Sequence, residues 1–345
     1  MRTSTDSTAS TSARYRAFAD IEARGMSACY EEWASGVAHD DAVIALIDRL
    51  PAPKRQPNLV FTSARYCGAR VSGYAEFAAW LSVHWAEVEA TCLSHATQTN
   101  EPGRCAVLLP ALAAIPGPLA LIEVGASAGL CLYPDRYSYR YRSPGSRSGR
   151  MLEPHAGPSP VLLDCEATGP VPLPDRPPEV VWRAGIDLNP LDVGRATDVA
   201  WLDALIWPEH HDRRARLHAA VQLAKAEPVE LVPGDLLAEL EALVDRAPAG
   251  ASVVVFHTAV LAYLDESARN SFVELVGRLP VTWLANEGQG VVPGVMERVA
   301  ALGAQPTSPS DFVLSTDGEP MAFTQPHGRA LHWIEQAHAT KAGEG

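Results

Sequence analysis

The residues best suited to chemistry in this sequence surround a short glycine-containing turn. The segment E-V-G-A-S-A-G (123–129) closes an apolar run that is typical of a buried parallel strand. Small residues here let the backbone approach a ligand, and a helix that begins after the turn would offer it free N–H groups. We therefore predict that Glu123, Gly125, Ser127 and Gly129 bind a cofactor.

Two other interpretations of this turn stay open. It satisfies the G-x-S-x-G pattern of a serine hydrolase, in which Ser127 would be the nucleophile and Asp235 or Asp265 would join His327 in a triad. It also fits a tight strand–helix packing turn without a ligand. The segment before the turn is helical in pattern and holds no His-Gly oxyanion segment, which favours the ligand-binding interpretation.

Polar side chains also end three later apolar runs. The runs at 179–187, 229–235 and 252–258 end at or near Asp187, Asp235 and His257. The carboxyl ends of parallel strands share one edge, where open α/β sheets bind ligands. We predict that Asp187 and Asp235 bind the cofactor and that His257 is a catalytic base. The alternative for each carboxylate is to cap the helix that follows it.

A second polar cluster precedes the glycine turn. It consists of Gln98, Thr99, Asn100, Glu101 and Arg104. As a substrate clamp, Arg104 would hold an anion and Glu101 would bind an amine or act as base, with the other three residues contacting substrate. The alternative is a capped helix start, with Thr99 or Asn100 as the cap.

Arg183 and Tyr139 are the remaining predicted substrate contacts. Tyr139 lies in an alternation of Tyr with polar residues that also fits a half-buried strand.

No metal site is expected. His211 and His218 share one predicted helix but are seven residues apart, which does not match the i, i+4 spacing of a helical histidine pair.

The hydrophobic pattern predicts a helical domain followed by a Rossmann-like α/β domain. Residues 1–13 are small and polar and are expected to be disordered, and helical periodicity extends over 14–115. From 116 to 345, strand-like runs alternate with helix-length segments. This order predicts a mostly parallel sheet with right-handed crossovers.

Two segments of the α/β domain depart from this alternation. The Pro- and Gly-rich stretch at about 134–178 is expected to be an irregular insertion that acts as a lid. The runs at 311–316 and 329–335 are predicted to form an antiparallel hairpin at the sheet edge.

Composition limits the classes of function. Of the residues, 47% are hydrophobic and 20% are charged, as in ordinary globular proteins, and the net charge of −13 argues against a general nucleic-acid binder. There is no apolar run long enough to span a membrane and no signal-peptide pattern. The six cysteines form no C-x-x-C pair, so we expect reduced thiols and a cytoplasmic enzyme.

Several motifs carry a family resemblance. They are Q-T-N-E-x-G-R (98–104), E-V-G-A-S-A-G-L (123–130), R-x-G-x-D-L-x-P-L-D (183–192), W-L-x-A-L-x-W-P (201–208) and P-H-G (326–328). On these motifs the sequence resembles a bacterial, mainly actinobacterial, family of unknown function from about Gln56 to Ile334. That family resembles divergent class I methyltransferases. The resemblance implies S-adenosylmethionine as cofactor and methyl transfer to a small molecule as the activity.

A different chemistry follows from a second association. The sequence also resembles proteins associated with natural-product pathways that close an aziridine ring by expelling sulfate from an amino-acid derivative. Such a cofactor-free cyclisation or elimination needs a base and an anion site, which Glu101 or Glu123 and Arg104 or Arg183 would supply. The expected partner is a small-molecule substrate, including an amino-acid derivative or a carrier-bound intermediate. A partner subunit, a homo-oligomer or a catalytically silent binding module are further alternatives.

Overall fold

The chain forms two compact units, a helical unit and a sheet unit. The computed structural model describes residues 10–98 and 100–335. The helical unit comprises residues 2–99 and 192–218, and the sheet unit comprises 100–191 and 219–345. Most of the predicted leader lies outside the described residues. Its last part is helical, because the Ser10 side chain accepts from Ala13 N at 3.2 Å and caps the first helix.

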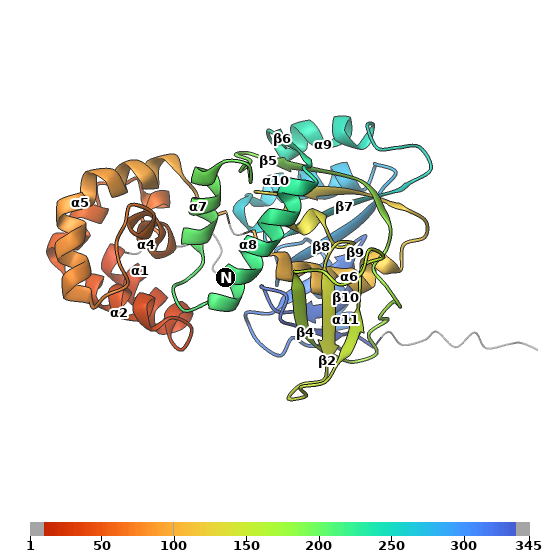
Figure 1. The fold of residues 1–345 in the computed structure, drawn as a ribbon, viewed down its shortest axis with the longest axis horizontal. Helices are drawn as coiled ribbons and strands as arrows, with labels where there is room; N and C mark the ends of the chain where they lie inside the picture. The colour runs from red at the N-terminus through yellow and green to blue at the C-terminus, as the bar shows by residue number, and fades with distance from the viewer. Residues whose placement is uncertain (1–9, 99, 336–345) are drawn as a thin grey trace, which may run out of the picture. The chain divides into compact units, whose positions relative to one another are not determined.

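The helical unit packs short helices around stacked aromatic rings. Its elements are α1 (Thr11–Ala17), η2 (Phe18–Ala23), α2 (Ala28–Val37), α3 (Asp41–Ile47), η3 (Ala52–Lys54), α4 (Pro57–Tyr66), α5 (Tyr74–Ser94), α7 (Ala196–Leu205) and the start of α8 (His211–Ala226) (Figure 1). Trp33 stacks on Phe77 with centroids 3.8 Å apart, and Phe61 meets both rings edge-on. These buried rings form the core of the unit.

The segment at 192–218 belongs to the helical unit, although the sequence placed it in the α/β domain. Trp201 donates its indole N–H to Ala96 O at 3.2 Å, and Trp207 donates to Asn58 Oδ1 at 2.9 Å. Arg65 donates to two carbonyls at the end of α7, at 2.9 and 2.6 Å. The W-L-x-A-L-x-W-P motif is therefore structural, because its tryptophans and its carbonyls attach this segment to α4 and to the end of α5.

The sheet unit confirms the predicted Rossmann-like α/β fold with a mostly parallel sheet. Its parallel half has the order β6-β5-β1-β7-β8. These strands are β1 (Leu119–Val124), β5 (Val180–Asp187), β6 (Glu230–Pro233), β7 (Ser252–Thr258) and β8 (Thr282–Gly288). The helices that accompany them are α6 (Cys105–Ala113), α9 (Leu236–Val244), α10 (Glu266–Val276) and α11 (Val295–Ala301). The strand order reverses between β1 and β7: β5 and β6 follow on the β1 side, and β8 follows on the β7 side.

The other half of the sheet differs from the prediction at 134–178. That segment contains β2 (Ser138–Arg142), β3 (Arg150–Leu152) and β4 (Leu162–Thr168), so it is not an irregular lid. Tyr139 and Tyr141 alternate with arginines and are buried, which explains why the stretch forms a strand. Its prolines and glycines lie mainly in the loops between strands.

The C-terminal strands are likewise not at the sheet edge. They are β9 (Phe312–Thr316), β10 (Glu319–Thr324) and β11 (Ala330–Trp333), and the sheet continues beyond β11 through β4, β2 and β3. Strands β8, β9, β10 and β11 are antiparallel to one another in sequence order, whereas β11 pairs with β4 in parallel. The predicted edge hairpin is therefore a three-stranded meander inside the described sheet.

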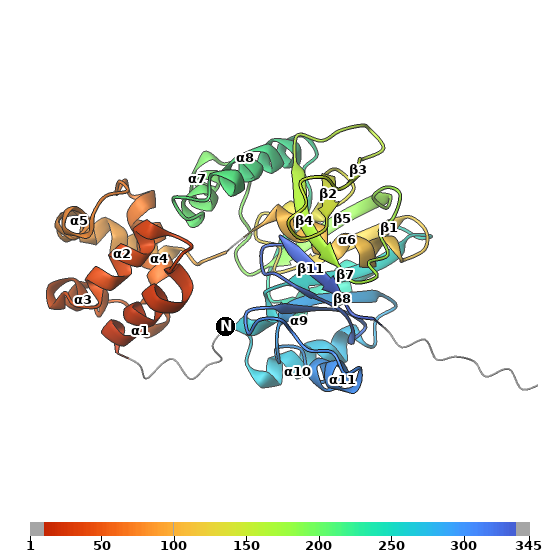
Figure 2. The ribbon, with the colours of Figure 1, turned by 90° about the horizontal axis from the view of Figure 1, so that it is seen from below.

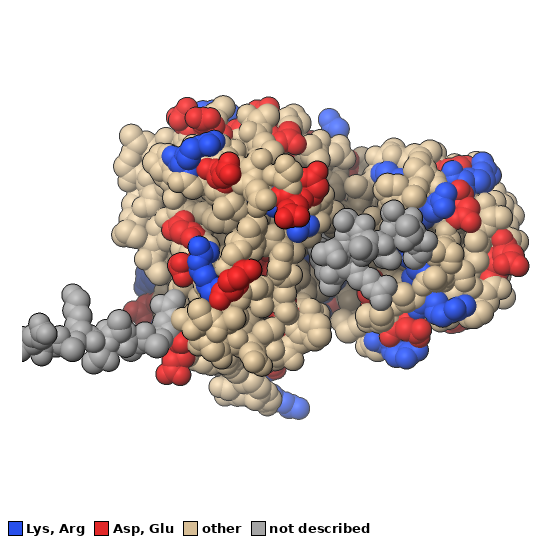
Figure 3. Space-filling model, turned by 180° about the vertical axis from the view of Figure 1, so that it is seen from behind, with Lys and Arg blue, Asp and Glu red and all other residues tan. Residues whose placement is uncertain are grey.

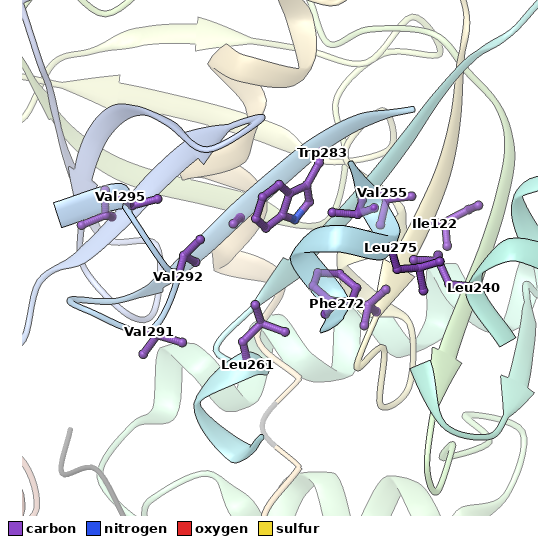
Figure 4. Close-up of a cluster of buried hydrophobic side chains, with 14 of the residues drawn as sticks. Ile122, Leu240, Val255, Leu261, Phe272, Leu275, Trp283, Val291, Val292 and Val295 are labelled. Carbon is purple, nitrogen blue, oxygen red and sulfur yellow. The ribbon is translucent and has the colours of Figure 1, made fainter. Parts of the chain in front are cut away.

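The two faces of the sheet are covered by different elements. On one face, α9, α10 and α11 bury a cluster that includes Ile122, Val255, Phe272 and Trp283 (Figures 2 and 4). Helix α6 contacts β4, β8 and β9 on the opposite face. Side chains alternate between faces along a strand, so a polar residue next to a cluster member points toward the α6 face. This alternation identifies the strand residues that face α6, and the candidate site consists of residues on that face.

The surface is mixed in charge. Figure 3 shows acidic and basic side chains interspersed over the face that it draws, without a dense basic patch. Among the described residues, no helix combines the length and the apolar character that a membrane crossing requires.

Candidate functional site

The candidate site lies at the carboxyl ends of β1, β7 and β8, on the face that α6 covers. The strand order reverses between β1 and β7, which is the position where open α/β sheets bind ligands. Glu123, Thr258 and Asn286 lie at or near the ends of these strands and are almost wholly buried. They alternate with members of the opposite cluster, so all three point to one face.

The glycine turn after β1 has an unusual backbone. Gly125, Ser127 and Gly129 have φ values of +70°, +52° and +70°. Left-handed φ is readily adopted by glycine and uncommon for serine. The turn leads into a short 3₁₀ helix, η5 (Leu130–Leu132), and no α-helix begins there. The helix N-terminus that the sequence predicted for anion binding is therefore not formed.

The N–H groups of the turn bond to the protein itself. Gly125 N and Ala126 N donate to Ile186 O at 2.8 and 3.0 Å, and Ser127 N donates to Asp187 Oδ2 at 2.8 Å. Asp187 also accepts from Asn189 N at 2.8 Å through Oδ1. Asp187 thus holds the turn against the end of β5.

Asn100 fixes the other side of the turn. Its Nδ2 donates to Ala126 O at 3.1 Å, and its Oδ1 accepts from Leu130 N at 2.8 Å. This amide bridges both ends of the loop from a segment about thirty residues earlier. The bridge explains why the motifs at 98–104 and 123–130 belong together, and it gives Asn100 a role in the turn rather than as a helix cap.

The spaces beside the glycines are filled by side chains. A Cβ at Gly125 would come within 2.4 Å of a methyl carbon of Val260, and one at Gly129 would come within 3.2 Å of both Leu231 and Val229. Packing therefore excludes a side chain at Gly125, and a Cβ at Gly129 would require Leu231 and Val229 to shift.

Arg104 is buried beside the end of β7 and has no acidic partner among the described residues. Its Nε donates to Pro326 O at 3.0 Å, and its Nη1 donates to Thr258 O at 3.0 Å and to Thr258 Oγ1 at 3.1 Å. In the described part of the chain, no carboxylate oxygen lies within 4.0 Å of its guanidinium, and Nη2 makes no hydrogen bond. Buried arginines are usually paired with acids. Arg104 is therefore a candidate anion contact, as predicted.

The position of Arg104 depends on a contact between two glycines. A Cβ at Gly328 would lie 1.9 Å from Gly103 O, and one at Gly103 would lie 2.6 Å from His327 O. The P-H-G segment is a turn, closed by Gly328 N donating to Gln325 O at 2.9 Å. It packs backbone-to-backbone against η4 (Pro102–Arg104).

Glu123 is a buried carboxyl group near this guanidinium. Burial raises its pKa well above the usual value of 4.5, neighbouring Cys131 raises it further, and the charge of Arg104 lowers it. Its Oε2 is buried and has no hydrogen-bond partner in the described part of the chain. Glu123 and Arg104 are thus close enough to interact but do not form an ion pair.

The structure does not support His257 as a base. His257 points to the opposite face, is 0% exposed, and contacts Glu287 Oε1 through Nδ1 at 2.7 Å. Trp283 donates its indole N–H to His257 Nε2 at 2.9 Å. An indole can only donate, so Nε2 is the acceptor and Nδ1 carries the proton. Both ring nitrogens are occupied, and Glu287 also accepts from two backbone N–H groups at 260 and 261.

Three further predicted residues have structural contacts instead. Asp235 caps α9 by accepting from Leu237 N at 2.8 Å, which was the alternative for this carboxylate. Arg183 makes a bidentate ion pair with Asp135 at 2.8 and 3.1 Å. Tyr139 is buried and donates to a backbone carbonyl at 134.

The polar cluster at 98–104 is only partly assembled at the site. Glu101 accepts from Gly103 N at 3.0 Å and caps η4, which differs from its predicted role as a base. Gln98 belongs to the helical unit, and Thr99 lies outside the described residues. Of this cluster, Asn100 and Arg104 contact the ends of the strands.

The two acids of the hydrolase interpretation have other contacts. Asp265 caps α10 by accepting from Ala268 N at 2.8 Å, as Asp235 caps α9. Both candidate triad acids therefore serve helix starts. Within the described residues there is no cluster of three or more metal-ligating side chains.

A family model matches residues 12–333 of this chain. The family is described as "Uncharacterized protein conserved in bacteria (DUF2332)". The chain belongs to this family. Neither the curated proteins nor the solved structures contain a match to it. The predicted membership of a bacterial family of unknown function is thereby confirmed.

In this DUF2332 chain, several groups that the sequence predicted to bind S-adenosylmethionine bond to the protein itself. The turn donates its N–H groups to Ile186 and Asp187, and Val260 fills the space at Gly125. Both oxygens of Asp187 already accept backbone N–H groups. A cofactor loop would need these groups free to face the ligand.

Sequence reasoning missed Asn286 in this DUF2332 chain. It lies near the end of the run at 281–287, so the rule that selected polar residues at strand ends could also have selected it. Thr258 ends the same run as His257 and was not among the predicted site residues. Its hydroxyl faces Arg104 while His257 faces the other way.

Proposed function

We propose that this DUF2332 chain is an enzyme that acts on a small anionic molecule by proton transfer, without a cofactor. The observation that carries the proposal is the pair Glu123 and Arg104. Both are buried at the point where the strand order reverses, and they are not joined as an ion pair. A buried charge without a partner is costly, and such costs are typical of functional sites.

The pair supplies what a cyclisation or elimination needs. In its ionised form, Glu123 takes a proton from a substrate N–H or C–H group. The electron pair released forms the new ring bond or double bond, while the bond to an oxyanion leaving group breaks. The leaving group departs with its electrons as an anion and contacts Arg104. The raised pKa makes Glu123 a stronger base than an exposed carboxylate, and the arginine stabilises the developing charge.

The direct test is anion release from candidate substrates. Purified protein would be incubated with O-sulfated β-hydroxy amino acids and their amides, with released sulfate measured by ion chromatography and the organic product by mass spectrometry. The Glu123→Gln variant is expected to lose about 10²-fold or more in rate. Arg104→Met is expected to lose rate as well, because the anion contact is removed. Asp235→Ala, which changes an exposed helix cap, is the control and retains the rate.

Methyl transfer is the second candidate. It is favoured by one observation: Asp187 ends β5, the strand next to β1, which is where the cofactor fold places its ribose-binding acid. We place either reaction in the cytoplasm, which the six free cysteines support.

A further inference from the structure

Asn286 carries a signal of ligand binding that the proposed mechanism does not use. Its side chain is 0% exposed at the end of β8. Its Oδ1 accepts from Thr324 Oγ1 at 2.6 Å, but its Nδ2 has no hydrogen-bond partner in the described part of the chain. Buried N–H groups are nearly always paired in native proteins. An acceptor that arrives with a ligand would explain this one.

Thr324 sets the orientation of the amide. Because its hydroxyl donates to Oδ1, the amide presents N–H groups on its other side. Thr324 lies on β10 and points to the α6 face, since the preceding Phe323 belongs to the opposite cluster. The donor at Asn286 is therefore fixed by a second buried residue.

Among the described residues, the hydrogen-bond donors next to Asn286 also have no acceptor for at least one N–H or O–H group. Thr258 is the register partner of Asn286 on β7, and both side chains point to the α6 face. Thr258 Oγ1 accepts from Arg104 Nη1, so its own hydrogen remains to donate. Arg104 Nη2 makes no hydrogen bond in the described part of the chain. The neighbouring donors Asn286 Nδ2, Thr258 Oγ1 and Arg104 Nη2 thus each have a hydrogen without an acceptor in that part of the chain.

We propose that Asn286 Nδ2, the Thr258 hydroxyl and Arg104 Nη2 together bind one oxyanion group of the substrate. The inference rests on the proposed function and extends it, because it identifies a sulfate, phosphate or carboxylate group as the recognised part of the substrate. Oxyanions accept several N–H and O–H donors at once, and a charged arginine strengthens the contact.

The test measures how anions stabilise the protein. Thermal unfolding would be followed with sodium sulfate, phosphate or acetate, at constant ionic strength set by sodium chloride. Wild-type protein is expected to show a saturable rise in Tm with at least one of these anions. The order of the three distinguishes a tetrahedral oxyanion from a carboxylate, and either preference supports the site.

A double variant separates binding from a structural role. Asn286→Leu with Thr324→Val replaces the amide and its hydroxyl partner by apolar groups of similar shape. Without anion, its Tm should equal or exceed that of wild type, because an unsatisfied buried donor has been removed. Its apparent anion affinity should fall by about tenfold or more. A lower Tm with unchanged anion affinity would overturn the inference.

The matched control is Gln289→Leu. Its amide Nε2 donates to Ser308 O at 2.8 Å and to Asp311 O at 3.2 Å, so the change should lower Tm and leave anion affinity unchanged. If Arg104→Met abolishes the anion effect and the double variant keeps it, the proposed function stands and the role of Asn286 is wrong. If wild type responds to none of the three anions, both fail.

Discussion

Arg104 and Thr258 are 154 residues apart, yet one guanidinium nitrogen, Nη1, contacts both the carbonyl and the hydroxyl of Thr258, at 3.0 and 3.1 Å. This double contact fixes the arginine to the end of β7. It also leaves Nη2 without an acceptor among the described residues, and the charge of Arg104 acts on the buried carboxyl of Glu123. The site is therefore built by joining the segment before the sheet to the strand at its centre.

The glycine contact behind Arg104 gives the first prediction. Gly328→Ala should lower the free energy of unfolding by about 3 kcal/mol or more or prevent folding, because the new Cβ would lie 1.9 Å from Gly103 O. Gly290→Ala is the control: its φ of +72° is similar, but no atom lies within 4 Å of the new Cβ. It should cost about 1–2 kcal/mol, from backbone strain alone. Urea unfolding measures both, and equal losses would contradict the account.

The contacts of His257 give the second prediction. Trp283→Phe leaves His257 Nε2 buried without its donor, and should lower the free energy of unfolding by about 1–3 kcal/mol. Tyr263→Phe, at an exposed side chain, should change it by no more than about 0.5 kcal/mol. If His257 were instead a catalytic base, Trp283→Phe would alter the pH profile of activity rather than stability.

The backbone contacts of the glycine turn give the third prediction. Calorimetric titration with S-adenosylhomocysteine at millimolar concentration should show no saturable binding, because the N–H groups of the turn and the carboxylate of Asp187 bond to each other and to β5. Saturable binding that Asp187→Ala weakens would favour methyl transfer over the cofactor-free mechanism.

The sequence predicted the fold better than the roles of single residues. Alternating strand and helix patterns were sufficient for the parallel half of the sheet, and Glu123 and Arg104 were selected by residue type and place. The face to which His257 points was not predictable, because a parallel strand buried on both sides has no polar–apolar alternation. His257 and Thr258 end the same strand, and only the structure shows which one faces Arg104.

The roles of other residues could not be predicted because one sequence pattern, an acidic residue at the end of a strand, has two structural roles. Asp187 and Asp235 both end strands, yet Asp235 caps a helix while Asp187 holds the glycine turn. Strands β3 and β4 were missed because prolines and glycines indicated a loop. The strand at 138–142 had been only the alternative for Tyr139, and the structure shows that Tyr139 and Tyr141 are buried there and bond to the rest of the sheet unit.

The measurement that tests the central claim most directly is the pH dependence of stability in wild type and Glu123→Gln. Burial raises the folded-state pKa of Glu123 above the usual 4.5, so the folded state binds the proton more tightly than the unfolded state. The stability contributed by the neutral carboxyl is fully present below pH 4.5 and is lost as pH rises through the folded-state pKa. The amide of the Glu123→Gln variant cannot ionise, so urea unfolding should show the variant becoming progressively more stable than wild type as pH increases. If the difference in free energy of unfolding between the two proteins were the same at all pH values, folding would not raise the pKa of Glu123. That result would contradict the account.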